Sequence, residues 1–267
     1  MTHRHLTTFE SRNDHLQLSC PYFVDVDQAA PGVDDVNRLP WSRLYLMDPD
    51  GPTGDDTVTD MLLRRRHRLV PGSILLLPPD RLYGFRFSPG MRMLAYHFRL
   101  EWAPGCDVFA TSERWQTIED GSMLVRHAYQ ALAAGEEALG SIARLRGLLL
   151  HIAGCFITDP PLPSTRIRSV LQRIEESCRA DLSLDDLAGE LGLRRETLSR
   201  QFRSEVGLTL QEHLHRRLVQ LAAPRLLAGE RVKDVAERLG FTSEFYFSRF
   251  FKRRTGSAPR DFRRLPT

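Results

Sequence analysis

The sequence has few of the cysteines that disulfide-stabilised folds require. Among its 267 residues are four scattered cysteines, and none of them forms a Cys-x-x-Cys pair: Cys20, Cys106, Cys155 and Cys178. The longest apolar run, residues 148–157, is too short to cross a bilayer. The polar segment from residue 1 to about residue 18 contains no signal-peptide core. We therefore expect a cytoplasmic protein with reduced thiols and no contact with a membrane.

Catalytic motifs are also missing from the chain. The sequence contains no serine–histidine–aspartate arrangement and no glycine loop of the kind that cradles phosphate. These absences argue against the common hydrolase and nucleotide-binding classes, and we expect a protein that is not an enzyme.

Positive charge is concentrated in the carboxyl-terminal part of the chain. Residues 165–267 contain 21 Lys and Arg against 14 Asp and Glu, a net charge of +7, whereas residues 1–164 have a net charge of −4. This asymmetry indicates that one part of the chain meets phosphate and the other does not. Lys233 and Lys252 are the only lysines. Arginine suits bidentate contacts with phosphate and guanine, but the base composition of the genome explains an arginine bias equally well.

The segment from Leu182 to Phe262 contains an internal repeat. The first half of the pattern returns 48 residues later: Leu187-Ala188, Leu191, Gly192 and Leu193 correspond to Val235-Ala236, Leu239, Gly240 and Phe241. The second half returns 49 residues later: Leu198, Arg200, Phe202 and Gly207 correspond to Phe247, Arg249, Phe251 and Gly256. Two copies are too few for a solenoid, so the repeat predicts two small and similar modules.

Each copy has the pattern of a helix-turn-helix. In the first copy, Leu184 and Leu187 follow helical spacing, and Gly192 then provides the residue that ends a helix and starts a tight turn. In the next helix, Leu198 and Phe202 are the only large apolar residues between residues 194 and 203. The remaining face of Arg, Ser, Thr and Gln is typical of a helix in a major groove. A plain helical hairpin is the alternative for one copy, but not for two copies in register.

Residues from about Thr165 to Arg264 resemble the DNA-binding domain of the AraC/XylS family of bacterial transcription regulators. The matching residues are 182–188 and Leu191-Gly192 in the first module, and Val235-Ala236, Gly240-Phe241, 246–249, Phe251-Lys252, Gly256, Pro259 and Phe262-Arg263 in the second. The resemblance implies two helix-turn-helix units, at about 184–205 and 232–254. It also implies that a linker helix joins them and that their recognition helices enter successive major grooves.

The exposed positions near the start of each recognition helix match the positions with which this family reads bases. These positions hold Arg195, Glu196, Ser199, Arg200, Glu244, Phe245, Ser248 and Arg249. Arginine would read guanine, and phenylalanine would touch a thymine methyl group. We expect contacts with phosphate, which position the protein without specifying a sequence, from Arg203, Arg217, Lys252 and Arg253.

The linker helix departs from the family pattern. Ala223 and the two leucines at 226 and 227 fit, but Val219 occupies the place of a basic residue and Pro224 follows the alanine. A proline inside a helix deletes a hydrogen bond and kinks the helix, at a cost of about 3 kcal/mol. The relative placement of the two recognition helices can therefore differ from that of the family. This leaves the spacing of the two DNA half-sites open, but it does not affect the expectation that the protein binds DNA.

The amino-terminal part reads as short strands separated by proline- and glycine-containing turns, from residue 25 to about residue 109. This pattern predicts an antiparallel barrel or sandwich. It resembles the cupin-like effector domain of many such regulators, and the segments that carry this resemblance are 71–79, 96–98 and 104–109. The resemblance predicts an effector domain over 1–158, with a tentative pocket of Tyr45, Arg66, Tyr83, Phe85, Tyr96 and His97. The arginines of 64–68 could suggest nucleic acid, but on a strand every second side chain points the same way, so we expect a solvated face, with some arginines reaching an anionic ligand inside the barrel.

Two other interpretations of the barrel remain. Metal-binding cupins need two or three histidines and a carboxylate that point inward. The predicted strands offer only His67 and His97, which do not form a His-x-His pair. We therefore expect no metal and no cofactor, although a cupin-type metal enzyme with a DNA-binding tail is an alternative. The other alternative is a regulator that needs no ligand, with a degenerate barrel.

A helical region from about residue 120 to residue 157 completes the effector domain. One apolar stripe in it, formed by Ile142, Leu145, Leu148, Leu149 and Ile152, suits either a dimer interface or packing on the barrel of the same chain. A proline-rich linker follows at 159–164, and the DNA-binding domain occupies 165–267.

The sequence thus predicts a two-domain protein, with an antiparallel barrel and helices followed by an all-α domain with two helix-turn-helix motifs. We predict a sequence-specific transcription regulator that a small-molecule effector controls. The expected partners are double-stranded DNA, the effector and a second copy of the chain, with RNA polymerase as a further partner to consider.

Overall fold

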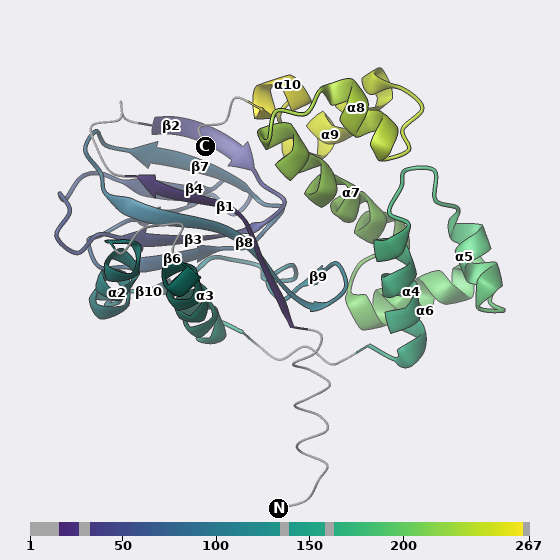
Figure 1. Cartoon of the computed structure of the whole chain (residues 1–267), viewed down its shortest axis with the longest axis horizontal. Coiled ribbons are helices and arrows are strands. Elements are labelled where there is room, and N and C mark those ends of the chain that lie inside the picture. Colours follow the sequence, from purple (N-terminus) through teal and green to yellow (C-terminus); the bar gives the residue numbers. More distant parts are fainter. Residues whose placement is uncertain (1–15, 27–32, 134–138, 158–162, 264–267) are drawn as a thin grey trace, which may run out of the picture. The chain divides into compact units, whose positions relative to one another are not determined.

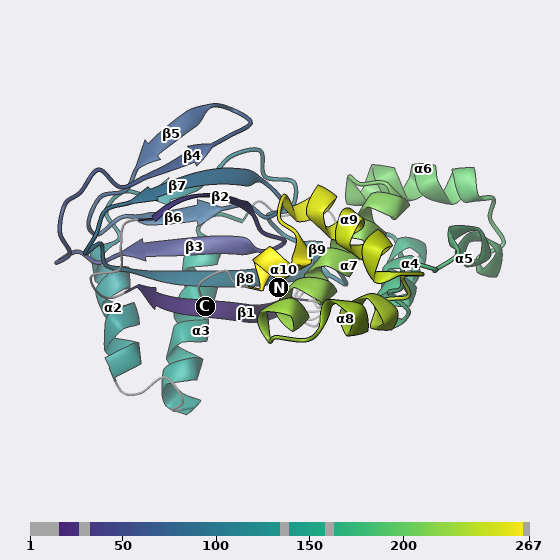
Figure 2. The same ribbon diagram turned by 90° about the horizontal axis from the view of Figure 1, so that it is seen from above.

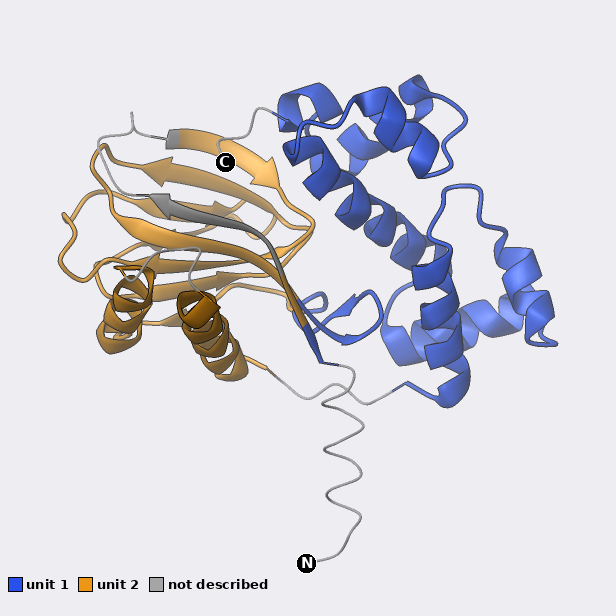
Figure 3. Cartoon of the chain, viewed as in Figure 1, with its two compact units in different colours: residues 1–17, 100–111, 159–267 blue, residues 18–99, 112–158 orange. Residues whose placement is uncertain are grey.

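The computed structural model describes residues 16–26, 33–133, 139–157 and 163–263. Within these residues the chain divides into two compact units (Figure 3): one combines 100–111 with 163–263, and the other combines 18–99 with 112–157. Strand β8, Met93–Ala103, starts in the second of these units and ends in the first. The segment 100–111, which the sequence places in the effector domain, therefore belongs to the helical unit. Most of the predicted linker at 159–164 lies outside the described residues.

The described strands form two sheets, one of six strands and one of four. The six-stranded sheet has the order β1-β8-β3-β6-β10, with β9 paired to β8: β1 Gln17–Val26, β3 Ser42–Met47, β6 Ile74–Leu77, β8, β9 Cys106–Asp107 and β10 Gln116–Ile118. The four-stranded sheet has the order β2-β7-β4-β5: β2 Val33–Arg38, β7 Leu82–Phe87, β4 Thr57–Asp60 and β5 Arg65–Arg68 (Figures 1 and 2). The register pairs that join β2 to β7, β7 to β4 and β3 to its neighbours are antiparallel, as predicted.

The core of the β-rich unit lies between the two sheets. Because successive side chains of a strand point to opposite faces, Tyr45 and Met47 of β3 face the same interior as Val58, Tyr83 and Phe85 of the four-stranded sheet. The alternate residues of β3, Leu44 and Leu46, are buried on the other face. Helices α2, Ser122–Ala133, and α3, Leu139–Gly154, lie side by side against that face (Figure 1).

Helix α3 divides the apolar stripe that the sequence predicted. Leu149 and Ile152 are buried, with 3% and 0% exposure, so this half packs within its own chain. Ile142 is 40% exposed, and Leu139 and Leu150 beside it are also exposed. Packing on the same chain thus accounts for the buried half of the stripe but not for the exposed half.

The helical unit has two helix-turn-helix modules joined by a long helix. Its elements are α4 Thr165–Glu176, α5 Leu184–Glu190, α6 Arg195–Val206, α7 Leu210–Leu227, α8 Val232–Arg238, α9 Glu244–Thr255 and α10 Pro259–Phe262. Helices α5 and α6 form the first module and α8 and α9 the second, and α7 runs between them (Figure 1). Helices α5 and α6 together span 184–206 and α8 and α9 span 232–255, where the sequence analysis expected modules at about 184–205 and 232–254.

Local chemistry explains where the helices of the modules begin and turn. The Ser183 hydroxyl accepts a hydrogen bond from the Asp186 amide and caps α5, and the Ser243 hydroxyl does the same for α9 through the Tyr246 amide. The turn of the second module places Gly240 at φ +75°, a left-handed conformation that favours glycine. A Cβ atom there would also lie 3.1 Å from the Cβ atom of Arg179.

Helix α7 continues through Pro224 to Leu227. Pro224 lies in the last turn, and its carbonyl accepts a hydrogen bond from the Ala228 amide. Because proline has no N–H group, one backbone hydrogen bond is missing from the last turn, but the helix continues past Pro224. Leu214, Leu218 and Ala222 of α7 are buried, so packing holds the helix between the two modules.

Candidate nucleic-acid interface and barrel site

The two recognition helices, α6 and α9, are anchored by a narrow apolar edge. Leu198 and Phe202 are fully buried in α6, and Phe247 and Phe251 occupy the same places in α9. The side chains of both helices that the sequence analysis predicted to contact DNA are exposed or half-buried. Each helix therefore presents a polar face to solvent, which is the arrangement that a major groove requires.

The eight predicted base-reading residues occupy equivalent positions of the two helices. They are the first, second, fifth and sixth residues of α6 and of α9, so they share one face near each amino-terminal end. Arg200 makes no ion pair within the described residues, and its side chain is exposed. By contrast, Arg195 contacts Asp185 at 2.8 Å in an exposed ion pair. The guanidinium of Arg249 lies over the Phe245 ring, 5.7 Å from its centre.

Three of the four predicted phosphate contacts lie further along the same helices. Arg203, Lys252 and Arg253 are exposed and belong to the last turns of α6 and α9. Positive side chains also interact favourably with the carboxyl-terminal end of a helix. They are therefore available to bind phosphates beside the groove.

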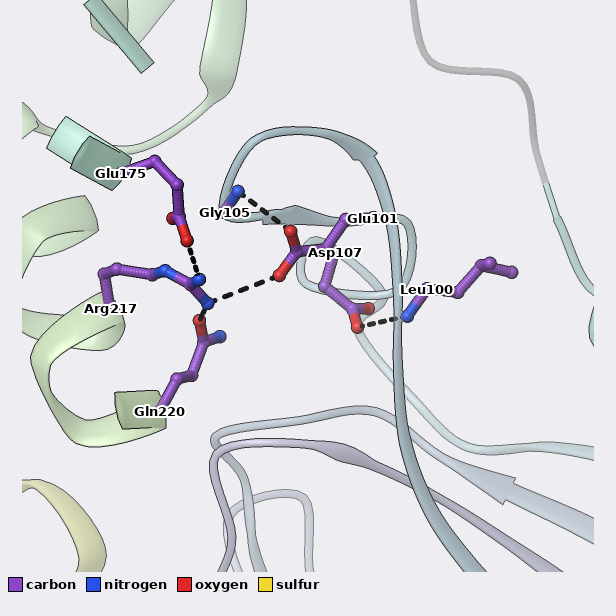
Figure 4. Close-up of polar contacts among 7 residues, drawn as sticks. All are labelled: Leu100, Glu101, Gly105, Asp107, Glu175, Arg217 and Gln220. Atoms are coloured by element: carbon purple, nitrogen blue, oxygen red, sulfur yellow. Dashed lines mark hydrogen bonds and ion pairs between the residues drawn. The ribbon is translucent and has the colours of Figure 1, made fainter. Parts of the chain in front are cut away.

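Arg217, the fourth predicted phosphate contact, requires a correction. Its side chain is 7% exposed and forms ion pairs with Glu175 and with Glu101, the latter at 3.5 Å (Figure 4). Its Nη1 group also donates to the Gln220 side chain at 3.2 Å. The guanidinium is therefore occupied inside the helical unit and is not available to DNA in this conformation.

The segment 100–111 holds the acidic side of this Arg217 cluster in place. The Gly105 amide donates to Glu101 Oε2 at 3.1 Å, and the Leu100 amide donates to Asp107 Oδ2 at 3.1 Å (Figure 4). A Cβ atom at Gly105 would lie 3.0 Å from the His213 ring, so the segment packs closely on α7. Burial is the main cause that lowers the pKa of His213 to about 4, with the charges of Arg217 and Arg216 acting in the same direction.

The barrel brings together four of the six predicted pocket residues. Tyr45, Tyr83 and Phe85 belong to the interior cluster, and His97 is 6.5 Å from Tyr45 between ring centres. Burial, followed by the nearby charge of Arg43, lowers the pKa of His97 well below its usual value. Burial also raises the pKa of Tyr83 to about 12. Tyr83 and His97 are thus uncharged at neutral pH.

The other two predicted pocket residues lie elsewhere. Tyr96 pairs with Leu44 across the strands, so it shares the face that the helices cover rather than the barrel interior. Arg66 pairs with Thr59 on the outer face of the four-stranded sheet and is exposed. Arg66 lines a surface hollow of about 390 Å³ together with Arg68 and Arg86.

The sequence analysis missed Arg43, which lies among the interior residues. It is 0% exposed, and its guanidinium carbon is 5.0 Å from the centre of the Tyr83 ring and 5.1 Å from that of Phe85. A signal was available, because Arg43 shares the two-residue alternation of Tyr45 and Met47. A charged residue at one of the interior-facing positions of a strand is unusual.

Two features are absent from the part of the chain that the structure describes. No group of three or more His, Cys, Asp or Glu side chains is arranged to hold a metal ion. No helix combines the length and the apolar character that crossing a membrane would require.

Comparisons with known proteins agree with this architecture. A family model described as a helix-turn-helix domain matches residues 187–265. The regulatory protein SoxS of Salmonella typhimurium is 35% identical over 98 residues, which cover 36% of this chain and 92% of SoxS. The transcriptional activator RhaS of Klebsiella pneumoniae is 33% identical over 163 residues, and the chain spans 56% of its length.

Solved structures of ToxT from Vibrio cholerae share the fold of almost the whole chain. An apo ToxT variant has a TM-score of 0.61 at 14% identity, covering 95% of this chain and 98% of ToxT. A ToxT structure bound to an unsaturated fatty acid has a TM-score of 0.56 at 13% identity, covering 96% of this chain and 97% of ToxT. A β-rich domain followed by two helix-turn-helix modules defines a DNA-binding transcription regulator. With SoxS and RhaS as relatives, the chain belongs to the AraC/XylS family of transcriptional regulators.

Proposed function

We propose that this regulator recognises a specific DNA sequence through α6 and α9 and that a small molecule bound in the barrel controls it. The observation that carries the DNA-reading part is the equivalence of the two recognition helices. Both are anchored by buried residues at their fourth and eighth positions, and both present the same four positions to solvent. Two equivalent reading surfaces suit two adjacent half-sites in the major groove.

Arg200 and Arg249 are the principal base-reading residues in this proposal. Both are the sixth residue of their helix, and both are exposed. An arginine at such a position donates two hydrogen bonds to the O6 and N7 atoms of guanine. Phe245, which is 71% exposed, supplies an apolar contact to a thymine methyl group. Arg195, Glu196, Ser199, Glu244 and Ser248 complete the reading set.

The proposal assigns phosphate contacts to Arg203, Lys252 and Arg253 and leaves Arg217 out. The three exposed residues strengthen binding to any DNA sequence, since phosphate contacts carry no base information. Their contribution falls as salt concentration rises, because each contact releases a counterion.

Control by a small molecule rests on the barrel. ToxT has the same fold and has been solved with an unsaturated fatty acid, and the interior of this barrel contains polar side chains among its aromatic residues. We propose that the protein is not an enzyme, since the relatives SoxS and RhaS are regulators. A regulator without a ligand remains the second candidate, because the interior cluster is closely packed.

Selection of a binding site from random double-stranded DNA, followed by affinity measurements, tests the DNA-reading part. We expect Arg200→Ala and Arg249→Ala each to weaken binding to the selected site by about 1–3 kcal/mol and to relax one base preference. Binding to scrambled DNA should change little. The matched control is Arg86→Ala, which removes an exposed arginine from the β-rich unit. Equal losses on both DNAs would make Arg200 a phosphate contact, and failure to select any sequence would refute specific recognition.

A further inference from the structure

Arg43 is a fully buried cation among the aromatic residues of the barrel interior. It lies on β3, a central strand of the six-stranded sheet, and pairs directly with His97 of β8 and Leu77 of β6. Its side chain is 0% exposed and faces the aromatic residues of the opposite sheet. Removing a guanidinium from water is costly, so a buried arginine normally has an ionised partner.

The partners of Arg43 within the described residues are neutral. Its Nη1 group donates to Asn37 Oδ1 at 2.7 Å, and the rings of Tyr83 and Phe85 offer cation–π contacts. The Asn37 side chain donates in turn to Asp35 Oδ2 at 2.8 Å, so a carboxylate approaches Arg43 only through an intervening amide. These contacts offset part of the cost of burying the charge.

The donors that remain unused form one edge of the guanidinium. Nε and Nη2 of Arg43 are buried and have no hydrogen-bond partner among the described residues. These two groups point in nearly parallel directions, which is the geometry that binds both oxygens of a carboxylate. The two unused donors together therefore match a carboxylate, whereas a single unused donor could bind almost any hydrogen-bond acceptor.

We propose that Arg43 binds the carboxylate of a small organic acid through its Nε and Nη2 groups. The inference rests on the proposed effector function of the barrel and names the chemical class of the effector. One cation with neutral neighbours selects a single negative charge, and Tyr45, Tyr83 and Phe85 select an apolar or aromatic body for the acid. His97 supplies no second positive charge at neutral pH, because burial lowers its pKa.

The side of Arg43 nearest to solvent is marked by Asn37. Asn37 is half-buried, whereas the other residues that contact the guanidinium, Tyr45, Tyr83 and Phe85, are buried. Asn37 belongs to β2, an edge strand of the four-stranded sheet. An edge strand has a free side and can separate from the sheet more easily than a central one.

Matched acids and amides test this site in the purified full-length protein. The probes are hexanoate and phenylacetate, with hexanamide and phenylacetamide as neutral partners of the same shape, titrated by calorimetry at constant ionic strength. We expect at least one acid to bind saturably and its amide to bind at least about 10-fold more weakly, because the amide lacks the charge. Equal affinity of an acid and its amide would overturn the proposal.

Substitutions assign the binding to Arg43. Arg43→Gln should weaken acid binding by at least about 10-fold, and Arg43→Lys, which keeps the charge but loses the paired donors, should have an intermediate effect. The matched control is Arg86→Gln, since Arg86 follows Phe85 on the opposite face of β7 and is exposed. It should bind like the wild type. If Arg43→Gln does not unfold cooperatively, Arg43→Lys decides, and wild-type affinity in the decisive variant would overturn the proposal.

Two parallel readouts separate this inference from the function on which it rests. DNA binding is measured with and without each acid, and native mass spectrometry records organic acids that co-purify. Acid binding that leaves the DNA affinity unchanged supports the Arg43 site and refutes effector control. Specific DNA binding with no binding of either acid and no co-purified acid refutes the Arg43 site and leaves the regulator intact.

Discussion

Arg217 of α7 and Glu101 of β8, 116 residues apart in the sequence, form a buried ion pair in the helical unit. Nη1 of Arg217 lies 3.5 Å from Oε1 of Glu101, and the two side chains are 7% and 9% exposed. Glu175 of α4 provides a second carboxylate, and Gln220 provides a neutral acceptor. Arg217 thereby connects α7, α4 and the segment 100–111, so its first role is to hold these elements together.

We predict that Arg217→Ala destabilises the protein by about 3–5 kcal/mol, because removal of one partner leaves Glu101 buried without its cation. Urea unfolding followed by circular dichroism measures the loss. Arg200→Ala serves as the control, since Arg200 is exposed and should change stability by less than about 0.5 kcal/mol.

The same pair of variants also tests the correction to the predicted phosphate contacts. If Arg217 contacted a phosphate instead, Arg217→Ala would unfold like the wild type. It would then weaken binding to all DNA sequences alike and reduce the salt dependence by about one contact.

The helical unit could be predicted from the sequence because its determinants are local. The glycines of the turns, the capping serines and the two apolar residues of each recognition helix all lie within short segments that occur twice. Exposure of the reading positions follows from helical periodicity alone. Arg217 was misassigned because its partner Glu101 is remote in the sequence, and helical periodicity says nothing about such a partner.

The barrel was predicted less completely, because its site depends on strand register. The alternation within a strand shows that Tyr45 and Arg43 share a face, but not which face is the interior. Tyr96 and His97 are neighbours in sequence and so point to opposite faces, and only the pairing of His97 with Arg43 identifies the inner one. Arg66 was included for its charge, and the pairing of β5 with β4 places it outside.

The exposed apolar face of α3 leads to a prediction about assembly. Leu139, Ile142 and Leu150 are exposed at 81%, 40% and 38% and recur at helical spacing. We predict a homodimer through this face, since a dimer would bury these apolar side chains. Ile142→Asp should halve the molar mass measured by analytical ultracentrifugation. His151→Asp places the same charge on an exposed residue of another face of α3 and should remain dimeric. A monomeric wild type, or a dimeric Ile142→Asp variant, would contradict the prediction.

His213 makes the stability of the helical unit depend on pH. Its ring is 2% exposed and packs against Phe202, with 5.5 Å between ring centres. Burial favours the neutral ring, so the pKa is about 4 in the folded protein against about 6.5 in an unfolded chain. Between these values the unfolded state binds a proton that the folded state does not. The stabilisation is therefore complete above about pH 6.5 and is lost as pH falls towards 4.

We predict that the free energy of unfolding falls by up to about 3 kcal/mol through His213 as pH is lowered from about 7 to 4. His213→Gln should flatten this part of the pH profile, although it also changes packing and so lowers stability at pH 7. Urea unfolding at a series of pH values measures both effects. His127→Gln, an exposed substitution on α2, should keep the wild-type slope. Because other buried histidines such as His97 contribute to the wild-type profile, the difference between the two variants isolates His213. Parallel profiles for the two variants would show that His213 takes up its proton equally in the folded and unfolded states.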